Sequence, residues 1–223
     1  MADEVILYDY GPCLFGMRVR IFLVEKEIDF EFREENPLYR KRPLLLTLNP
    51  VHKMVPVLVH NGKPICESLI ILQYIDEVWK DKPSLLPSDP YELSYARFWA
   101  DFADKKIYWT GRASWKPWGE KGYTQEEAKK EYIESLKMIE EQLGEKPYFA
   151  GESFGFLDVA LIPYSAWFYA YETAGNFSVE KECPKLMCWV KRCMERESVS
   201  KALPDPIMVY EFLLLLKKLR GVE

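Results

Sequence analysis

The strongest constraint on the fold is a junction near residue 13, where a short apolar strand gives way to a helix. Residues 5–8 form a β-branched, apolar run that is too short for a helix and favours a strand. Gly11-Pro12 interrupts this run, and apolar residues recur at helical spacing from Phe15 onward. Cys13 is therefore expected at or just before the N-terminus of a helix that follows a strand.

Strands and helices alternate through the first eighty residues. Residues 29–33 alternate between polar and apolar side chains, which predicts a second strand. Two further strands, 57–60 and 64–66, flank Asn61-Gly62, a dipeptide that strongly favours a two-residue hairpin turn. A helix opening at Glu67-Ser68 completes the unit. This order predicts a small mixed sheet of four strands, with the first helix as its crossover.

The composition changes at residues 81–90, where three prolines predict a linker. Beyond it the long apolar patterns have helical spacing, so residues 91–223 are expected to form an all-helical domain beside an α/β domain of residues 1–80. The almost wholly apolar stretch 157–173 is expected to be the buried central helix of that domain. Asp158, at the N-terminal edge of the stretch, is expected to cap this helix rather than to act in catalysis.

Charge and composition exclude several classes of function. The 223 residues carry a net charge of −5, which argues against a nucleic-acid partner. No apolar run approaches the roughly 20 residues that span a bilayer, and the acidic residues 1–4 do not resemble a signal or transit peptide. The five cysteines form no CxxC pair, and with two histidines no metal site is expected. The expectation is a cytoplasmic protein with reduced thiols.

The position of Cys13 suggests a chemical role. Unpaired main-chain N–H groups and the helix macrodipole favour a thiolate over a thiol at a helix N-terminus. The helix end and one N–H bond together are expected to lower the pKa of Cys13 by roughly one to two units. Cys66, in a strand without such a terminus, is expected to stay unreactive. The alternative for Cys13 is a buried and inert thiol, the commoner fate of this residue type.

Several longer stretches carry a family resemblance over essentially the whole chain. They are Phe15-Gly16-Met17-Arg18-Val19-Arg20-Ile21, Leu44-Leu45-Leu46, Asn49-Pro50-Val51-His52-Lys53, Val55-Pro56-Val57-Leu58, residues 61–71, Phe98-Trp99-Ala100-Asp101-Phe102 and Asp104-Lys105-Lys106-Ile107-Tyr108. These stretches resemble the plant-type tau class of cytosolic glutathione transferases. The resemblance implies a thioredoxin-like N-terminal domain, an all-helical C-terminal domain, glutathione as co-substrate and a homodimer.

The resemblance also assigns residues to glutathione. Glu67-Ser68 match the pair that holds the γ-glutamyl end, by an ion pair with its ammonium and by hydrogen bonds to its carboxylate. Val55 matches the residue whose main chain pairs with the cysteinyl unit, and the following Pro56, compatible with a cis bond, leaves that main chain unpaired. Lys41 and Lys53 match the lysines that attract the glycyl carboxylate.

Departures from the tau pattern change the expected reaction. Tau members typically carry serine and proline where this chain has Cys13-Leu14, and Arg40 and Arg42 replace the usual asparagine and serine around Lys41. A cysteine donates a weaker hydrogen bond to a glutathione thiolate than a serine does, but it can form a mixed disulfide with glutathione. Cysteine-bearing omega, lambda and dehydroascorbate-reductase classes perform such exchange. The sequence therefore favours glutathione-dependent thiol transfer through Cys13.

The second substrate is expected between the two domains. The candidate residues are Phe15, Tyr108, Trp109, Ala113 and Trp115, with Phe212 and Leu216 from the last helix. Ordinary core packing is the competing explanation for the aromatic side chains. Two other functions stay open: conventional conjugation of glutathione to apolar electrophiles, and non-catalytic carriage of glutathione adducts or apolar ligands. The intact Glu67, Ser68 and Lys53 argue against a module that keeps only the fold.

Overall fold

A four-stranded mixed sheet forms the first half of the chain in the computed structural model, which describes residues 3–35, 43–114, 124–219 and 221. The strands are β1 (Val5–Asp9), β2 (Glu31–Glu34), β3 (Val57–His60) and β4 (Lys63–Cys66). Their order is β2-β1-β3-β4, with β1 parallel to β2 and antiparallel to β3. Asn61 and Gly62 turn the β3–β4 hairpin at positive φ angles of 48° and 75°. The predicted sheet is thus confirmed.

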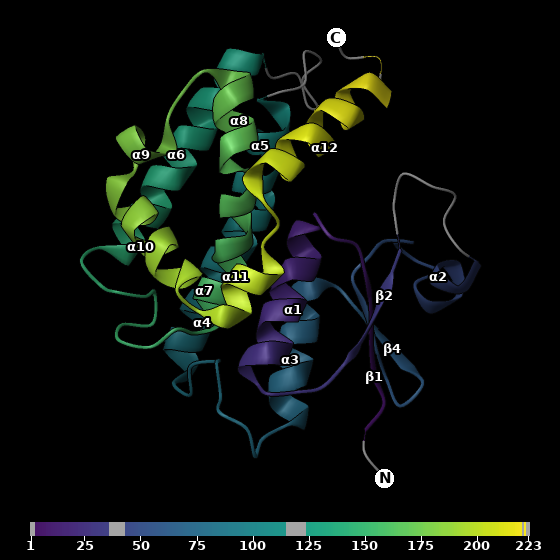
Figure 1. Ribbon diagram of the computed structural model, residues 1–223. Helices are drawn as coiled ribbons and strands as arrows, with labels where there is room; N and C mark the ends of the chain where they lie inside the picture. The colour runs from purple at the N-terminus through teal and green to yellow at the C-terminus, as the bar shows by residue number, and fades with distance from the viewer. Residues whose placement is uncertain (1–2, 36–42, 115–123, 220, 222–223) are drawn as a thin grey trace.

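The two faces of the sheet are covered by different helices (Figure 1). Helix α1 (Leu14–Glu25) connects β1 to the parallel β2, and α3 (Ser68–Val78) follows β4. Both lie between the sheet and the helices of the second half. On the opposite face, α2 (Pro43–Leu48) packs Leu45 against Ile6, Tyr8, Val57 and Val59 of β1 and β3. The alternation of side chains along each strand separates these two apolar layers.

Beyond residue 90 the long elements that the structure describes are helical, as expected. They are α4 (Pro90–Phe102), the π-helical turn η1 (Ala103–Ile107), α5 (Tyr108–Ala113), α6 (Gln125–Leu143), α7 (Phe156–Leu161), the 3-10 helix η3 (Ile162–Trp167), α8 (Phe168–Gly175), α9 (Val179–Glu182), α10 (Pro184–Met194), α11 (Glu197–Ala202) and α12 (Pro206–Leu219). Several of these helices are short, with only four to six residues.

The expected single helix over residues 157–173 is wrong in one respect. Most of the stretch is buried, but it divides into α7, η3 and α8, and Pro163 at the start of η3 has no N–H to donate to the helical ladder. The expected capping role of Asp158 is confirmed. Its carboxylate accepts hydrogen bonds from the main-chain N–H groups of Phe149 (3.1 Å) and Gly155 (3.0 Å), and from the Trp189 indole (2.8 Å).

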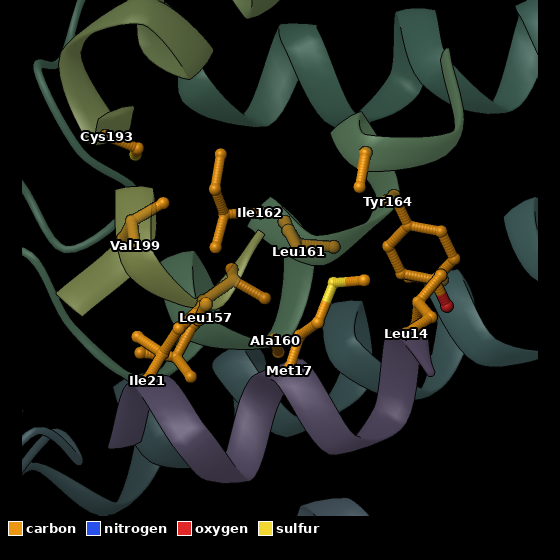
Figure 2. Close-up of a cluster of buried hydrophobic side chains, with 14 of the residues drawn as sticks. Leu14, Met17, Ile21, Leu157, Ala160, Leu161, Ile162, Tyr164, Cys193 and Val199 are labelled. Atoms are coloured by element: carbon orange, nitrogen blue, oxygen red, sulfur yellow. The ribbon is translucent and has the colours of Figure 1, made fainter. Parts of the chain in front are cut away.

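A single hydrophobic core joins the two halves of the chain. Figure 2 shows Leu14, Met17 and Ile21 of α1 directed toward Leu157, Ala160 and Leu161 of α7. These side chains are all buried, and the same cluster continues into the sheet through Leu7 and Leu58. Because α1 packs on the sheet with one side and on the helical half with another, the position of its N-terminus depends on both halves.

A buried arginine in α1 adds a polar link across this core. The Arg18 guanidinium donates to both carboxylate oxygens of Asp104 in η1, at 3.0 and 2.6 Å, and to the Ala160 carbonyl of α7 at 2.8 Å. It also donates to the hydroxyl of Ser68 in α3 at 3.2 Å, while Tyr164 donates to Asp104 at 2.8 Å. A charge in this position is tolerated because it is paired and hydrogen-bonded on several sides.

Replacement of Asp104 tests the importance of this link. In Asp104→Ala the Arg18 charge keeps its burial but loses its carboxylate, so the free energy of unfolding should fall by about 3 kcal/mol in urea denaturation. Asp101→Ala on the neighbouring turn is the matched control, because Asp101 pairs with Lys105 at the exposed surface and should have little effect. Equal stabilities of the two variants would contradict this account of Arg18.

Candidate functional site

Cys13 occupies the N-cap position of α1, as the sequence predicted. Its backbone is extended, with φ −71° and ψ 109°, and its carbonyl accepts the first helical hydrogen bond from the Met17 N–H at 2.9 Å. Its own N–H donates to the Tyr10 carbonyl at 3.0 Å, which fixes the loop after β1. The main-chain N–H groups of Phe15 and Gly16 lie next to the sulfur. The geometry of a helix N-terminus is therefore present.

The expected low pKa of Cys13 is not found. The residue is only 5% exposed, and burial raises the pKa of the thiol well above its usual value. The neighbouring Asp9 carboxylate raises this pKa further, whereas the Phe15 and Gly16 N–H groups lower it. Desolvation and a like charge outweigh the helix end, so the predicted thiolate is corrected to a protonated thiol at neutral pH.

Asp9, which the sequence analysis missed, is a buried carboxylate at the end of β1. It is fully buried, and neither oxygen makes a hydrogen bond of ordinary geometry with the described residues, although the Cys13 thiol and the Tyr10 amide lie beside it. Arg20 Nε lies 3.5 Å from Asp9 Oδ2. Burial raises the pKa of Asp9 to about 7, and the charge of Arg20 lowers it in part.

The sheet brings three segments of the expected glutathione site to one edge. The register pairs Val57 with both Tyr8 and Cys66, so the loop after β1, the residues before β3 and the residues after β4 end side by side. Cys13 lies four residues after β1, Val55 lies two residues before β3, and Glu67-Ser68 directly follow β4. This meeting point depends on the strand order β2-β1-β3-β4.

Each of these residues has a distinct local environment. Ser68 begins α3, is 6% exposed and accepts the hydrogen bond from Arg18. Glu67 precedes it with a positive φ of 70°, and its carboxylate is half exposed, 3.8 Å from His52 Nε2. The Val55–Pro56 bond is cis, and the main chain of Val55 has no hydrogen-bond partner among the described residues.

The two expected lysines are placed differently. Lys53 lies exposed in the loop between α2 and β3, with a positive φ of 57°. Lys41 falls outside the residues that the structure describes. Of the five residues expected to bind glutathione, four can thus be located, and all four follow or precede β3 and β4.

Part of the expected second-substrate group is assembled. The Phe15 and Tyr108 rings lie 5.0 Å apart between their centroids, and the Tyr108 and Trp109 rings 5.3 Å apart. Arg112, one turn further along α5, donates to the Tyr108 hydroxyl at 2.6 Å. These contacts place aromatic side chains of α5 beside the first turn of α1.

The remaining candidates are more dispersed. Ala113 is buried, and Leu216 packs partly buried against the core, which favours ordinary packing for both. Trp115 lies outside the described residues. The ring of Phe212 in α12 lies beside the Tyr10 ring, with 6.1 Å between the ring centroids. Tyr10 was also missed, although its place directly before the Gly11-Pro12 interruption could have identified it.

Tyr10 lies between the Cys13 thiol and the aromatic side chains of α5. Burial raises the pKa of its hydroxyl, and the nearby Cys13, Asp9 and Tyr108 raise it further. The hydroxyl is thus neutral and lies close to both the α1 terminus and α5. Neutral aromatic side chains therefore lie beside the α1 terminus on this side, with the Arg112 guanidinium near the Tyr10 and Tyr108 hydroxyls.

Other site classes find no support within the described part of the chain. No group of three or more His, Cys, Asp or Glu side chains there is placed to hold a metal ion. No helix described is both long and apolar enough to cross a membrane. All five cysteines are free, and burial raises the pKa of Cys66, in line with its expected lack of reactivity.

Comparison with known proteins identifies the family. The family models for the glutathione S-transferase N-terminal and C-terminal domains match residues 3–77 and 98–197. The probable glutathione S-transferase parC of Nicotiana tabacum is 61% identical over 222 residues, which cover 99% of each chain.

Solved structures agree with this result. Rice GST1, crystallised in complex with glutathione, is similar with a TM-score of 0.90 and 44% identity over 98% of each chain. The tau-class glutathione S-transferase of mango (Mangifera indica) is similar with a TM-score of 0.88 and 41% identity, over 96% of this chain and 98% of the mango chain. The chain therefore belongs to the glutathione S-transferase family and, within it, to the plant tau class.

Proposed function

We propose that this enzyme conjugates glutathione to apolar electrophiles, with the glutathione sulfur as the nucleophile. The observation that carries the proposal is the burial of Cys13, whose thiol pKa is raised by desolvation and by Asp9. A thiol that stays protonated at neutral pH is a poor nucleophile. In the proposed reaction glutathione loses its thiol proton, its sulfur bonds to the electrophilic carbon, and the leaving group departs with the bonding electrons.

Glutathione would bind at the sheet edge formed by residues 1–80. The unpaired main chain of Val55 suits the main chain of the cysteinyl unit, as in strand addition. The half-exposed Glu67 carboxylate suits the γ-glutamyl ammonium, and the N-terminus of α3 at Ser68 suits its carboxylate. We assign Lys41 and Lys53 to the glycyl carboxylate, as the resemblance implies.

The electrophile would bind beside the first turn of α1, on the side of the helical domain (residues 91–223) that follows the linker 81–90. There the Tyr108 ring contacts the rings of Phe15 and Trp109. The Phe212 ring lies beside the Tyr10 ring. Aromatic walls with few polar groups are typical of sites for apolar ligands. The Tyr108 hydroxyl and Arg112 supply the polar groups that would orient such a substrate.

Removal of the Glu67 carboxylate tests the glutathione site. Glu67→Ala should weaken glutathione binding roughly ten- to a hundredfold in calorimetry, because a charge-assisted hydrogen bond contributes about 1.5–3 kcal/mol. Glu77→Ala, at the exposed C-terminal end of α3, should leave the affinity unchanged. Equal affinities of the two variants would remove glutathione from this edge of the sheet.

Thiol transfer through Cys13 is a second candidate, favoured by one observation. The N–H groups of Phe15 and Gly16 lie beside the sulfur and would stabilise a thiolate formed during attack. In that reaction the Cys13 sulfur bonds to the glutathionyl sulfur of a mixed disulfide, and the substrate leaves as a thiolate. A second glutathione then releases Cys13 and forms glutathione disulfide.

Parallel assays on one preparation separate the two reactions. We expect aryl-halide conjugation to exceed disulfide reduction in the native enzyme. Cys13→Ser should raise conjugation by roughly tenfold, because a hydroxyl donates a stronger hydrogen bond than a thiol to the glutathione thiolate. Dominant disulfide reduction that disappears in Cys13→Ser, with a glutathione adduct on Cys13, would instead establish thiol transfer.

We also propose a homodimer, on the basis of an exposed aromatic face of α4. Tyr91 is 72% and Phe98 is 59% exposed, and aromatic side chains are enriched at protein interfaces. The partner is a second copy of the chain, as the family resemblance implies. Light scattering should give about twice the chain mass of 26.3 kDa, and the Phe98→Glu variant should give the single mass. A native particle of 26.3 kDa would contradict the proposal.

A cytoplasmic location is consistent with the state of the thiols. The five cysteines are all free, including Cys183 and Cys193 within the core. Free thiols persist in a reducing compartment, which also supplies glutathione.

A further inference from the structure

One buried charge next to the reaction centre has no part in the proposed conjugation. Asp9 is fully buried, and neither of its oxygens makes a hydrogen bond of ordinary geometry with the described residues. Its main chain is fixed in the sheet, because Asp9 pairs with Glu34 and its carbonyl accepts from the Glu35 N–H at 2.8 Å. A buried carboxylate with so little compensation is costly, so its presence calls for an explanation.

The first turn of α1 is shaped around this carboxylate. A Cβ atom at Gly16 would lie 1.9 Å from the Asp9 carboxyl carbon and from both of its oxygens. Gly16 therefore lets the carboxylate press against the main chain of the helix, beside the Cys13 sulfur. The N-terminal end of a helix favours a negative charge, and the Asp9 carboxylate and the Cys13 sulfur share this end. The Phe15 and Gly16 N–H groups lie beside the sulfur, and the Tyr10 N–H lies beside the carboxylate.

We propose that Asp9 determines which sulfur reacts, by holding Cys13 as a thiol and so leaving glutathione as the nucleophile. This inference rests on the proposed conjugation. Two negative charges in one desolvated space repel each other strongly, so an ionised Asp9 opposes ionisation of Cys13. Asp9 thereby acts as a specificity-determining residue that suppresses thiol transfer.

The other charged and titratable groups nearby do not cancel this effect. Arg20 of α1 lies 3.5 Å from Asp9, but its guanidinium also donates to the Gly11 carbonyl at 2.8 Å. From α5, Arg112 is hydrogen-bonded to Tyr108, and the Tyr10 hydroxyl is neutral. Glu35, which follows β2, is also buried, and its main-chain N–H donates to the Asp9 carbonyl at 2.8 Å.

The two acids titrate as a coupled pair. Burial raises the pKa of Asp9 to about 7, so the pair loses its first proton near neutrality. Once Asp9 carries its charge, the thiol proton is retained to higher pH. Removal of the carboxylate should therefore lower the pKa of the thiol, because the helix end and the Phe15 and Gly16 N–H groups then act against desolvation alone.

The test compares alkylation of Cys13 in the native enzyme and in Asp9→Asn. Both proteins are treated with iodoacetamide from about pH 6 to pH 10, and each cysteine-containing peptide is quantified by mass spectrometry. In Asp9→Asn the midpoint of Cys13 alkylation should fall by at least one pH unit, and the rate at pH 7 should rise at least tenfold. Oxidised glutathione should then add to Cys13 in the variant.

The other cysteines act as controls within the same sample. Cys183 and Cys193 are buried far along the sequence, and their continued protection shows that Asp9→Asn has not loosened the fold. A Cys13 midpoint that stays unchanged or rises while these two remain protected would overturn the role of Asp9.

If Asp9→Asn does not fold, the alkylation midpoint of Cys13 in the native enzyme still tests the inference. In the native enzyme alone, the Cys13 midpoint should lie above the value of about 8.5 for a free cysteine. A native midpoint below about pH 7 would overturn both this inference and the proposed conjugation. A high native midpoint that Asp9→Asn leaves unchanged would overturn the role of Asp9 alone.

Discussion

The buried guanidinium of Arg18 holds the two halves of this enzyme in one arrangement. It lies in α1, pairs with Asp104 of the helical half, and donates to Ser68 at the start of α3. Ser68 is a residue we assign to the γ-glutamyl end of glutathione, so the helical half helps to position the glutathione site of the sheet. Because a buried charge must keep its partners, α1, α3 and η1 cannot shift independently of one another.

Elements with strong local signals were predictable from the sequence. The apolar strands and the Asn61-Gly62 turn appear as expected. Two helical features were not predicted. Helix α2 is short and gains its stability from Leu45 packing on the sheet, while Pro163 divides the stretch expected to be one helix. Tertiary packing and one missing N–H decided these cases.

The candidate site shows the same division between local and tertiary information. The position of Cys13 at the start of α1 followed from the local pattern, but the pKa of its thiol did not. Asp9 is visible in the sequence as an acidic residue after an apolar strand. Its burial against Gly16 and its place beside the sulfur depend on how α1 folds back onto the sheet. Desolvation is a property of the assembled core, and no spacing rule reports it.

At neutral pH we expect Cys13 to be a thiol and glutathione to be the nucleophile. Thiolates absorb in the ultraviolet where thiols do not, so a difference titration between the native enzyme and Cys13→Ser isolates the ionisation of this one sulfur. We expect no thiolate step assigned to Cys13 below about pH 8.5, the usual region for free cysteine. A step complete below about pH 7 would contradict it and would make Cys13 the reactive sulfur of the enzyme.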